Sequence, residues 1–286
     1  MKKLGFIGGG NMAEALARGL LEQRVFAPGD LIIADVDAAR RRKIARALKV
    51  ETTADNRAVA RNARAILLAV KPQHIDDVLA ELAEAMAPAS GAAARKTAAH
   101  KTAGSGRLVI SIAAGITIAR MTAAIGRRAR VIRVMPNAPA MVGQGMAALV
   151  RAPGASKADE AFALRIFRAV GDAVALSDER LLDAVTALSG SGPAYAYLFI
   201  KGLADAAVSE GLPAALALRM ALKTMRGAEE NMRRSALTAA ELIRVVASPG
   251  GTTEAALRRF DERGFSAIVA DALHAAAERS RELGRK

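Results

Sequence analysis

The stretch LGFIGGGNMA, residues 4–13, decides the fold expected for the first half of this chain. An apolar run of four residues leads into Gly8, Gly9 and Gly10, and a helical stretch then covers residues 11–23. In such a G-x-G-x-x-A sequence the first glycine permits a tight turn, the second lets a phosphate approach the backbone, and the small last residue lets helix and strand pack closely. The helix N-terminus would offer free N–H groups to a pyrophosphate. The stretch predicts a dinucleotide site, and the alternative is a glycine turn needed for packing only.

Further apolar runs follow and alternate with helical stretches. They are LIIA (31–34), AILLAV (65–70), RLVISIAA (107–114) and RVIRVM (130–135). Continuous apolar runs of this length, separated by helices, are typical of parallel strands that are buried on both faces. The series predicts an α/β fold with an N-terminal Rossmann-like doubly wound sheet, which we expect to span residues 1–176.

From about residue 178 the pattern is almost wholly helical. One run extends from Pro193 to Glu210, the next begins at Pro213, a Thr238–Glu241 capping box opens a short helix, and a last helix covers residues 265–283. The run that begins at Pro193 is apolar or small around much of its circumference, so it should be buried by other helices. We therefore expect residues 177–286 to form an all-helical domain that dimerises.

The composition limits the class of protein. The chain has 286 residues, 52% of them apolar, and no apolar run approaches the ~18 residues that a membrane span needs. It has no cysteine, which excludes disulfides and thiolate metal sites and fits a reducing cytoplasm. The three histidines are scattered, without an i, i+4 pair, so we expect no metal site.

The net charge of +14 raises the alternative of a nucleic-acid binder. Only 3% of the residues are aromatic, so stacking platforms for single strands are nearly absent. The arginines are spread over many helical stretches and interleaved with alanine. We expect a solvated basic surface and no nucleic-acid or membrane partner.

Residues 88–106, PASGAAARKTAAHKTAGSG, differ from the rest because they contain no large apolar side chain. The composition predicts an exposed, flexible insertion between a helix and the next strand. A tolerated surface loop is favoured over a functional lid.

Two features near the second strand point to different cofactors. Asp35 closes that strand, and a carboxylate there would bond the ribose hydroxyls of NADH and disfavour a 2′-phosphate. The run ARRRK (39–43) follows, and its guanidinium groups would suit the 2′-phosphate of NADPH. The cofactor preference between NADPH and NADH therefore stays open.

The stretch SPGGTT, residues 248–253, interrupts the helical half with a tight turn. Gly250 and Gly251 can turn successive N–H groups inward, and together with a new helix N-terminus they would form a nest for a small anion such as a carboxylate. The alternative is a Pro-Gly turn with a threonine cap. The sequence shows no Ser-His-Asp, Cys-His or paired-carboxylate arrangement, so no residue stands out as a catalytic nucleophile.

Six stretches together resemble the pyrroline-5-carboxylate reductase family, and the resemblance runs over nearly the whole chain except residues 88–106. They are GFIGGGNMAEAL, LAVKPQ (68–73), SIAAGIT (111–117), RVMPNAPA (133–140), LSGSGPAYAY (188–197) and VASPGGTTEAAL (246–257). The resemblance implies an NADPH- or NADH-dependent oxidoreductase that reduces 1-pyrroline-5-carboxylate to L-proline, the last step of proline biosynthesis. It also implies helices that interlock with a second subunit, as a homodimer or a ring of dimers.

The same resemblance implies roles for particular residues. The loop that would hold the substrate carboxylate is formed by Gly250, Gly251, Thr252 and Thr253. Thr253 would lie near the imine nitrogen as a catalytic residue, and Ser248, also assigned to catalysis, opens the loop. The expected cofactor-binding residues are Ile7, Gly8, Gly9, Gly10, Asn11, Met12, Asp35, Asn56, Ala69, Val70, Lys71, Pro72, Ala113 and Ala114.

Chemistry agrees with these roles, because hydride transfer needs positioning rather than a nucleophile. The imine accepts hydride better once its nitrogen is protonated, and either Thr253 or prior protonation in water would serve. The chain departs from the family pattern at Ile243, Arg244 and Val245, which leaves substrate contacts from that helix open.

A β-hydroxyacid dehydrogenase is a rival interpretation. It would need an asparagine four residues after Lys201, where this chain has Asp205. A non-enzymatic nucleotide binder would have no need of the SPGGTT turn.

Overall fold

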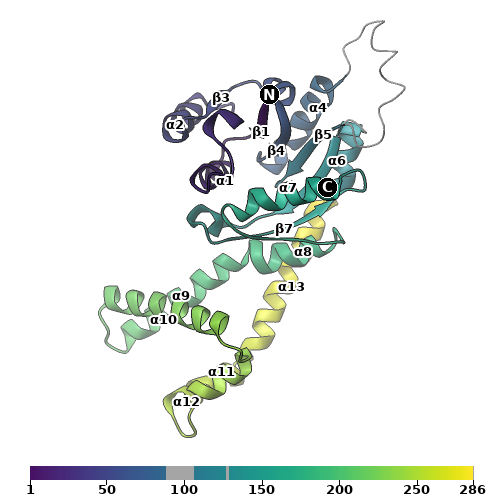
Figure 1. The fold of residues 1–286 in the computed structure, drawn as a ribbon. Helices are drawn as coiled ribbons and strands as arrows, with labels where there is room; N and C mark the ends of the chain where they lie inside the picture. Colours follow the sequence, from purple (N-terminus) through teal and green to yellow (C-terminus); the bar gives the residue numbers. More distant parts are fainter. Residues whose placement is uncertain (88–105, 127–128, 286) are drawn as a thin grey trace, which may run out of the picture. The chain divides into compact units, whose positions relative to one another are not determined.

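The computed structural model describes residues 1–87, 106–126 and 129–285 (Figure 1). Apart from Gly106, the insertion expected at residues 88–106 lies outside the described residues. The chain forms two compact units: Met1–Gly190 with the C-terminal residues from Ala276 onward, and Ser191–Ala275.

The first unit is built on a single eight-stranded sheet. Its order is β3-β2-β1-β4-β5-β6-β7-β8, and every neighbouring pair is parallel except β6 and β7. The strands are β1 (Lys2–Ile7), β2 (Leu31–Ala34), β3 (Glu51–Thr53), β4 (Ala63–Leu68), β5 (Arg107–Ser111), β6 (Ala129–Met135), β7 (Gly145–Arg151) and β8 (Gly171–Ala175). The order of the first six strands is that of a dinucleotide-binding doubly wound sheet, with its reversal between β1 and β4.

Helices pack on both faces of this sheet (Figure 1). Successive strand residues point to opposite faces, so Phe6 belongs to one core and Ile7 to the other. One core is covered by α1 (Asn11–Glu22), α2 (Ala38–Leu48) and α7 (Lys157–Arg168), and the other by α3 (Asn56–Asn62), α4 (Ile75–Ala85) and α6 (Ile118–Ile125). Burial on both faces explains why the strand sequences are continuous apolar runs.

The register of the parallel strands brings their carboxyl ends to one edge. Ile7 pairs with Ala34 on β2 and with Leu68 on β4, and Leu68 in turn pairs with Ser111 on β5. The residues after these four strands therefore emerge side by side. In open α/β sheets, ligands bind outside the carboxyl ends of the strands, where the strand order reverses.

The second unit contains helices only, in the part of it that the structure describes. They are α9 (Gly192–Ser209), α10 (Ala214–Arg234), α11 (Ala239–Val246), α12 (Thr252–Glu262) and the start of α13 (Phe265–Gly284). Small residues let α9 and α10 pack closely, with Ala204, Ala217 and Ala221 buried between them. The predicted capping box is present: Thr238 and Glu241 each bond the other's backbone N–H.

The expected fold class is confirmed, a Rossmann-like doubly wound sheet followed by a helical part. The short strands β3 and β8 and the antiparallel β7 were not predicted from the sequence. Strand β8 buries only one of its five residues fully, which leaves little hydrophobic pattern to detect. No helix among the described residues has both the length and the apolar character to cross a lipid bilayer.

Candidate active site

The loop between β1 and α1 can be formed only with glycine at its first position. Gly8 has a φ of +94°, and its N–H donates to the carbonyl of Ala34 at 2.8 Å. A Cβ on Gly8 would lie 2.7 Å from the carbonyl oxygen of Ala69 on the neighbouring strand end. At Gly10 a Cβ would meet no heavy atom within 4 Å. The loop is therefore tight on its sheet side and open at the N-terminus of α1.

Asp35, directly after β2, and Arg40 on α2 bond the two sides of Gly9. The backbone N–H of Gly9 donates to Oδ2 of Asp35 at 2.7 Å, and Nε of Arg40 donates to the carbonyl of Gly9 at 2.6 Å. The Nη2 of Arg40 also donates to Oδ1 of Asn11 at 2.9 Å, and lies 3.3 Å from a carboxylate oxygen of Glu14. The glycine loop is thus connected to the helix that follows β2.

Glu14 is the anionic centre of this cluster. Its side chain, only 14% exposed, forms ion pairs with Arg18, Arg40 and Lys43. Partial burial by itself would raise the pKa of Glu14, but the hydrogen bond from Lys43 and the nearby guanidinium groups outweigh it and hold the pKa below its usual value. Sequence reasoning did not select Glu14, although its position in the first turn of the helix was visible.

The turn after β2 uses the remaining acceptors of Asp35. Its Oδ1 accepts the N–H of Asp37 at 2.8 Å, and its carbonyl accepts from Nη1 of Arg41 at 2.7 Å. The same Nη1 donates to the carbonyl of Val36 at 3.0 Å. Arg40 and Arg41, two of the arginines that suggested a 2′-phosphate site, are therefore bonded to backbone carbonyls of this turn and of the glycine loop.

The other expected cofactor residues lie after β4, β5 and β3. The N–H of Ala69 donates to the carbonyl of Ile7 at 2.8 Å, and a Cβ on Gly8 would meet the backbone of Ala69 and Val70, so these two residues lie beside the glycine loop, with Lys71 and Pro72 directly after them. After β5, Ala113 is buried and donates its N–H to Oγ of Ser111 at 3.2 Å, whereas Ala114 is exposed. Asn56, at the start of α3, donates its side-chain N–H to Glu81 on α4 at 2.8 Å.

These residues fit a dinucleotide. The first backbone N–H groups of α1 have no intrahelical partner, and the space over Gly10 is free of protein atoms. Within the described residues, no three His, Cys, Asp or Glu side chains gather as metal ligands would.

The second candidate region is the loop before α12, which lies in the helical unit. Gly250 has a φ of +72°, and its N–H donates to Oε2 of Glu254 at 2.6 Å. The N–H of Gly251 donates to the carbonyl of Ser248 at 3.0 Å. A Cβ on Gly251 would lie 2.5 Å from Oγ and 3.0 Å from the carbonyl oxygen of Ser248, so a larger residue there would have to displace the Ser248 side chain. The open donors of the loop are therefore the N–H groups of Thr252 and Thr253, at the start of the helix.

Comparison with known proteins identifies the family. A family model described as pyrroline-5-carboxylate reductase dimerisation matches residues 179–283, and one described as NADP oxidoreductase, coenzyme F420-dependent, matches residues 3–90. A pyrroline-5-carboxylate reductase from Synechocystis is 40% identical over 284 residues, which cover 99% of each chain. The chain belongs to the pyrroline-5-carboxylate reductase family.

Solved structures of the family agree with this assignment. A pyrroline-5-carboxylate reductase from Coxiella burnetii superposes with a TM-score of 0.88 at 32% identity and covers 100% of this chain and 99% of its own. A Plasmodium falciparum pyrroline carboxylate reductase with NADP bound gives a TM-score of 0.83 at 29% identity, covering 99% and 98%. The resemblance predicted from the sequence, and the fold that it implied, are confirmed.

In this pyrroline-5-carboxylate reductase family member, two family stretches that the sequence singled out are joined by Asn137. Its Nδ2 lies 3.2 Å from the carbonyl and 3.1 Å from Oγ of Ser189, and its Oδ1 accepts the N–H of Met146 at 2.8 Å. Ser189 belongs to a π-helical turn, Thr186–Gly190, and a Cβ on Gly190 would clash with the Met135 side chain. In the sequence, only its place in RVMPNAPA marks Asn137, and nothing there indicates this contact.

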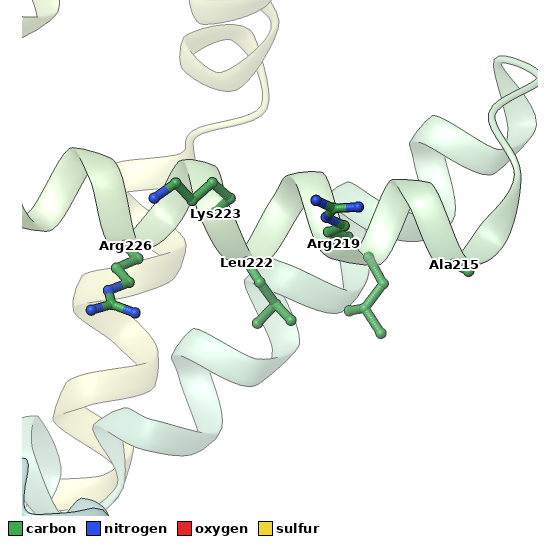
Figure 2. A pocket seen from close by; sticks show the side chains of 6 residues that line it. Ala215, Arg219, Leu222, Lys223 and Arg226 are labelled. Carbon is green, nitrogen blue, oxygen red and sulfur yellow. The ribbon is translucent and has the colours of Figure 1, made fainter.

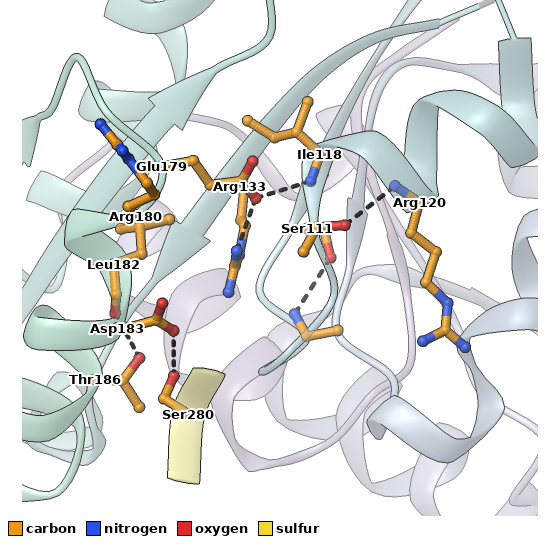
Figure 3. Close-up of polar contacts among 12 residues, drawn as sticks. Ser111, Ile118, Arg120, Arg133, Glu179, Arg180, Leu182, Asp183, Thr186 and Ser280 are labelled. Carbon is orange, nitrogen blue, oxygen red and sulfur yellow. Dashed lines mark hydrogen bonds and ion pairs between the residues drawn. The ribbon is translucent and has the colours of Figure 1, made fainter. Parts of the chain in front are cut away.

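A second buried contact fixes the loop after β5. Arg133, 8% exposed, forms an ion pair with Oε1 of Glu179 at 2.7 Å, and the same oxygen accepts the N–H of Ile118 at 2.8 Å (Figure 3). The C-terminal part of α13 reaches this region too, where Oγ of Ser280 donates to Asp183 at 2.6 Å. The bond to Ile118 anchors the end of the segment that contains Ala113 and Ala114.

The lysine that suggested a β-hydroxyacid dehydrogenase lies on the surface of the helical unit. Nζ of Lys201 is 2.5 Å from Oδ2 of Asp205, and both side chains are well exposed. This is an ordinary i, i+4 ion pair of a solvated helix.

Proposed function

We propose that this chain reduces 1-pyrroline-5-carboxylate to L-proline with NADPH or NADH, the last step of proline biosynthesis. The observation that carries this proposal is the full-length match to pyrroline-5-carboxylate reductases, which covers 99% of the chain. The sequence predicts an oxidoreductase, and the relatives named above are reductases. The open helix N-terminus after Gly251 supports it, because a substrate with one carboxylate needs such donors.

The first part of the chain, residues 1–176, would bind the dinucleotide. The loop Gly8–Gly10 with Asn11 and Met12 would hold the pyrophosphate, because the N–H groups of α1 and the open space over Gly10 suit an anion. The other assigned residues would flank it from the ends of the neighbouring strands, namely Ile7, Asp35, Asn56, Ala69, Val70, Lys71, Pro72, Ala113 and Ala114. The bound nicotinamide supplies the hydride, and the protein supplies position.

The second part, residues 177–286, would bind the substrate and a second subunit. The N–H groups of Thr252 and Thr253 would hold the substrate carboxylate, with the Ser248 hydroxyl beside them. Gly250 and Gly251 shape the loop, since their own N–H groups are already bonded within it. The Thr253 hydroxyl would orient the proton at the imine nitrogen, which makes the imine carbon a better hydride acceptor.

The partner of this part would be a second copy of the chain, in a homodimer or a ring of dimers. Large apolar side chains of α9 and α10 are exposed, including Tyr197, Leu198, Leu218 and Leu222. A groove along α10 is lined by Ala215, Leu218, Arg219, Leu222, Lys223 and Arg226, and Figure 2 shows its basic side chains beside Leu222. The matched dimerisation region contains these helices. We further propose that the enzyme works in the cytoplasm, without a nucleic-acid or membrane partner.

The test is a turnover assay with full-length protein, 1-pyrroline-5-carboxylate and either NADPH or NADH, with proline identified as the product. Changing Thr253 to Val should lower kcat about 10- to 100-fold and leave cofactor affinity nearly unchanged. Thr122→Val, on an exposed position of α6 in the first unit, is the matched control and should retain full activity. A folded protein that binds cofactor but forms no proline would disprove the proposal.

A further inference from the structure

The carboxylate of Glu254 lies on the loop to which we assigned substrate binding. Glu254 is the third residue of α12, and its side chain folds back so that Oε2 accepts the N–H of Gly250 at 2.6 Å. Gly250 precedes the helix by two residues and has a positive φ, and its N–H points at the Glu254 side chain. A negative charge of the protein is therefore held within one helical turn of the open N–H groups of Thr252 and Thr253.

No cation of the described chain forms an ion pair with this carboxylate. Across the described ranges, Glu254 forms no ion pair with Lys, Arg or His, although the chain carries 42 Lys and Arg residues. The arginines that lie further along the same helix pair with Glu262 instead. A carboxylate ligand at the start of α12 would thus lie beside a second carboxylate, and like charges at one site repel each other.

The charge of the ligand decides how large this repulsion is. A cyclic imino acid with a protonated nitrogen carries its positive charge on the atom next to the carbon that bears the carboxylate. Its net charge is zero, so Glu254 repels one end and attracts the other. An acid of the same shape without the cationic nitrogen is repelled only.

We propose that Glu254 is a specificity-determining residue that makes this loop select carboxylates accompanied by a cationic nitrogen over simple anions. This inference rests on the proposed function, since it takes the loop at residues 248–253 as the substrate site. Its consequence for the reaction is that the loop favours the protonated imine, the form that accepts hydride. The Thr253 hydroxyl then needs only to orient a proton that the substrate already carries.

Two five-membered ring acids test this directly. L-Proline is a zwitterion, and tetrahydrofuran-2-carboxylate has a ring oxygen in place of the nitrogen and is a simple anion. Their Kd values are measured by calorimetry on the full-length protein saturated with NADP⁺. Glu254→Gln keeps an acceptor for the Gly250 N–H and removes the charge, and it should strengthen binding of the anion relative to proline by about fivefold.

Two further variants separate the charge from the hydrogen bond. Glu254→Ala should lose the same discrimination, because it also removes the charge, and it serves if the Gln variant does not fold. Glu262→Gln, at the other end of α12, should leave the ratio of the two Kd values as in the wild type. A ratio that stays within twofold in both Glu254 variants would overturn the inference. Continued proline formation by the wild type would then show that the proposed function itself stands.

Discussion

The carboxylate of Asp35 accepts the backbone N–H of Gly9 at 2.7 Å, and a Cβ on that glycine would lie 3.2 Å from the same oxygen. The acidic residue at the end of the second strand is thus in direct contact with the glycine loop. The position that would select the adenosine ribose also holds the loop that would bind the pyrophosphate.

The charge of Asp35 should act on cofactor preference separately from its hydrogen bond. Asp35→Asn keeps an oxygen that can accept the Gly9 N–H but removes the negative charge beside a 2′-phosphate. We expect the ratio of Kd values to move toward NADP⁺ by about five- to tenfold. Titrations with NAD⁺ and NADP⁺ measure this, and an unchanged ratio would mean that the carboxylate lies away from the 2′ position.

Arg40 should support both cofactors equally. It donates to the Gly9 carbonyl and to Asn11, so Arg40→Ala should loosen the loop and raise the Kd of NAD⁺ and NADP⁺ alike, by about tenfold. Arg46→Ala, at an exposed position further along the same helix, is the control and should change neither value. If Arg40→Ala weakened NADP⁺ alone, the guanidinium would be a 2′-phosphate ligand.

Alanine substitutions at two glycines of the same loop should have different effects, one on stability and the other on cofactor binding. Gly8→Ala combines a φ of +94° with a clash against Ala69, so it should lower the free energy of unfolding by about 2–4 kcal/mol. Gly10→Ala has an ordinary φ of −63° and open space, so it should fold normally and lose cofactor affinity. Urea unfolding and cofactor titration of both variants separate the two roles, and equal stability of both would argue against the strain.

Stability toward acid should depend on Glu14. Its pKa is held below the usual value near 4.5, so the unfolded chain binds this proton more readily than the folded one. The contribution to stability is present above about pH 4.5 and is lost as the pH falls through the lower pKa of the folded state. Glu14→Gln should flatten the decline in Tm on the acid side, and parallel pH profiles for variant and wild type would contradict this.

Local features of the chain were predictable from sequence because nearest neighbours determine them. A positive φ at Gly8, the cap at Thr238 and the glycine turn before Thr252 each depend on residues within a few positions. Five buried strands, β1, β2, β4, β5 and β6, were recognised for the same reason, since apolar runs bounded by breakers reflect burial on both faces, but the buried strand β7 was missed. Strand β7 carried no sign that it would pair antiparallel, because strand direction is a property of the connection and not of the strand.

The sequence alone therefore determined the glycine loop, the alternation of strands and helices, the helical second half and the family resemblance. Tertiary structure decided which side chains meet: Asp35 reaches Gly9 across 26 positions, Arg40 reaches it across 31, and Asn137 reaches Ser189 across 52. It also turned Glu254 onto Gly250, a contact between near neighbours that exists only because the loop before α12 bends back. Such contacts depend on sheet register and loop path, which no local pattern of residues encodes.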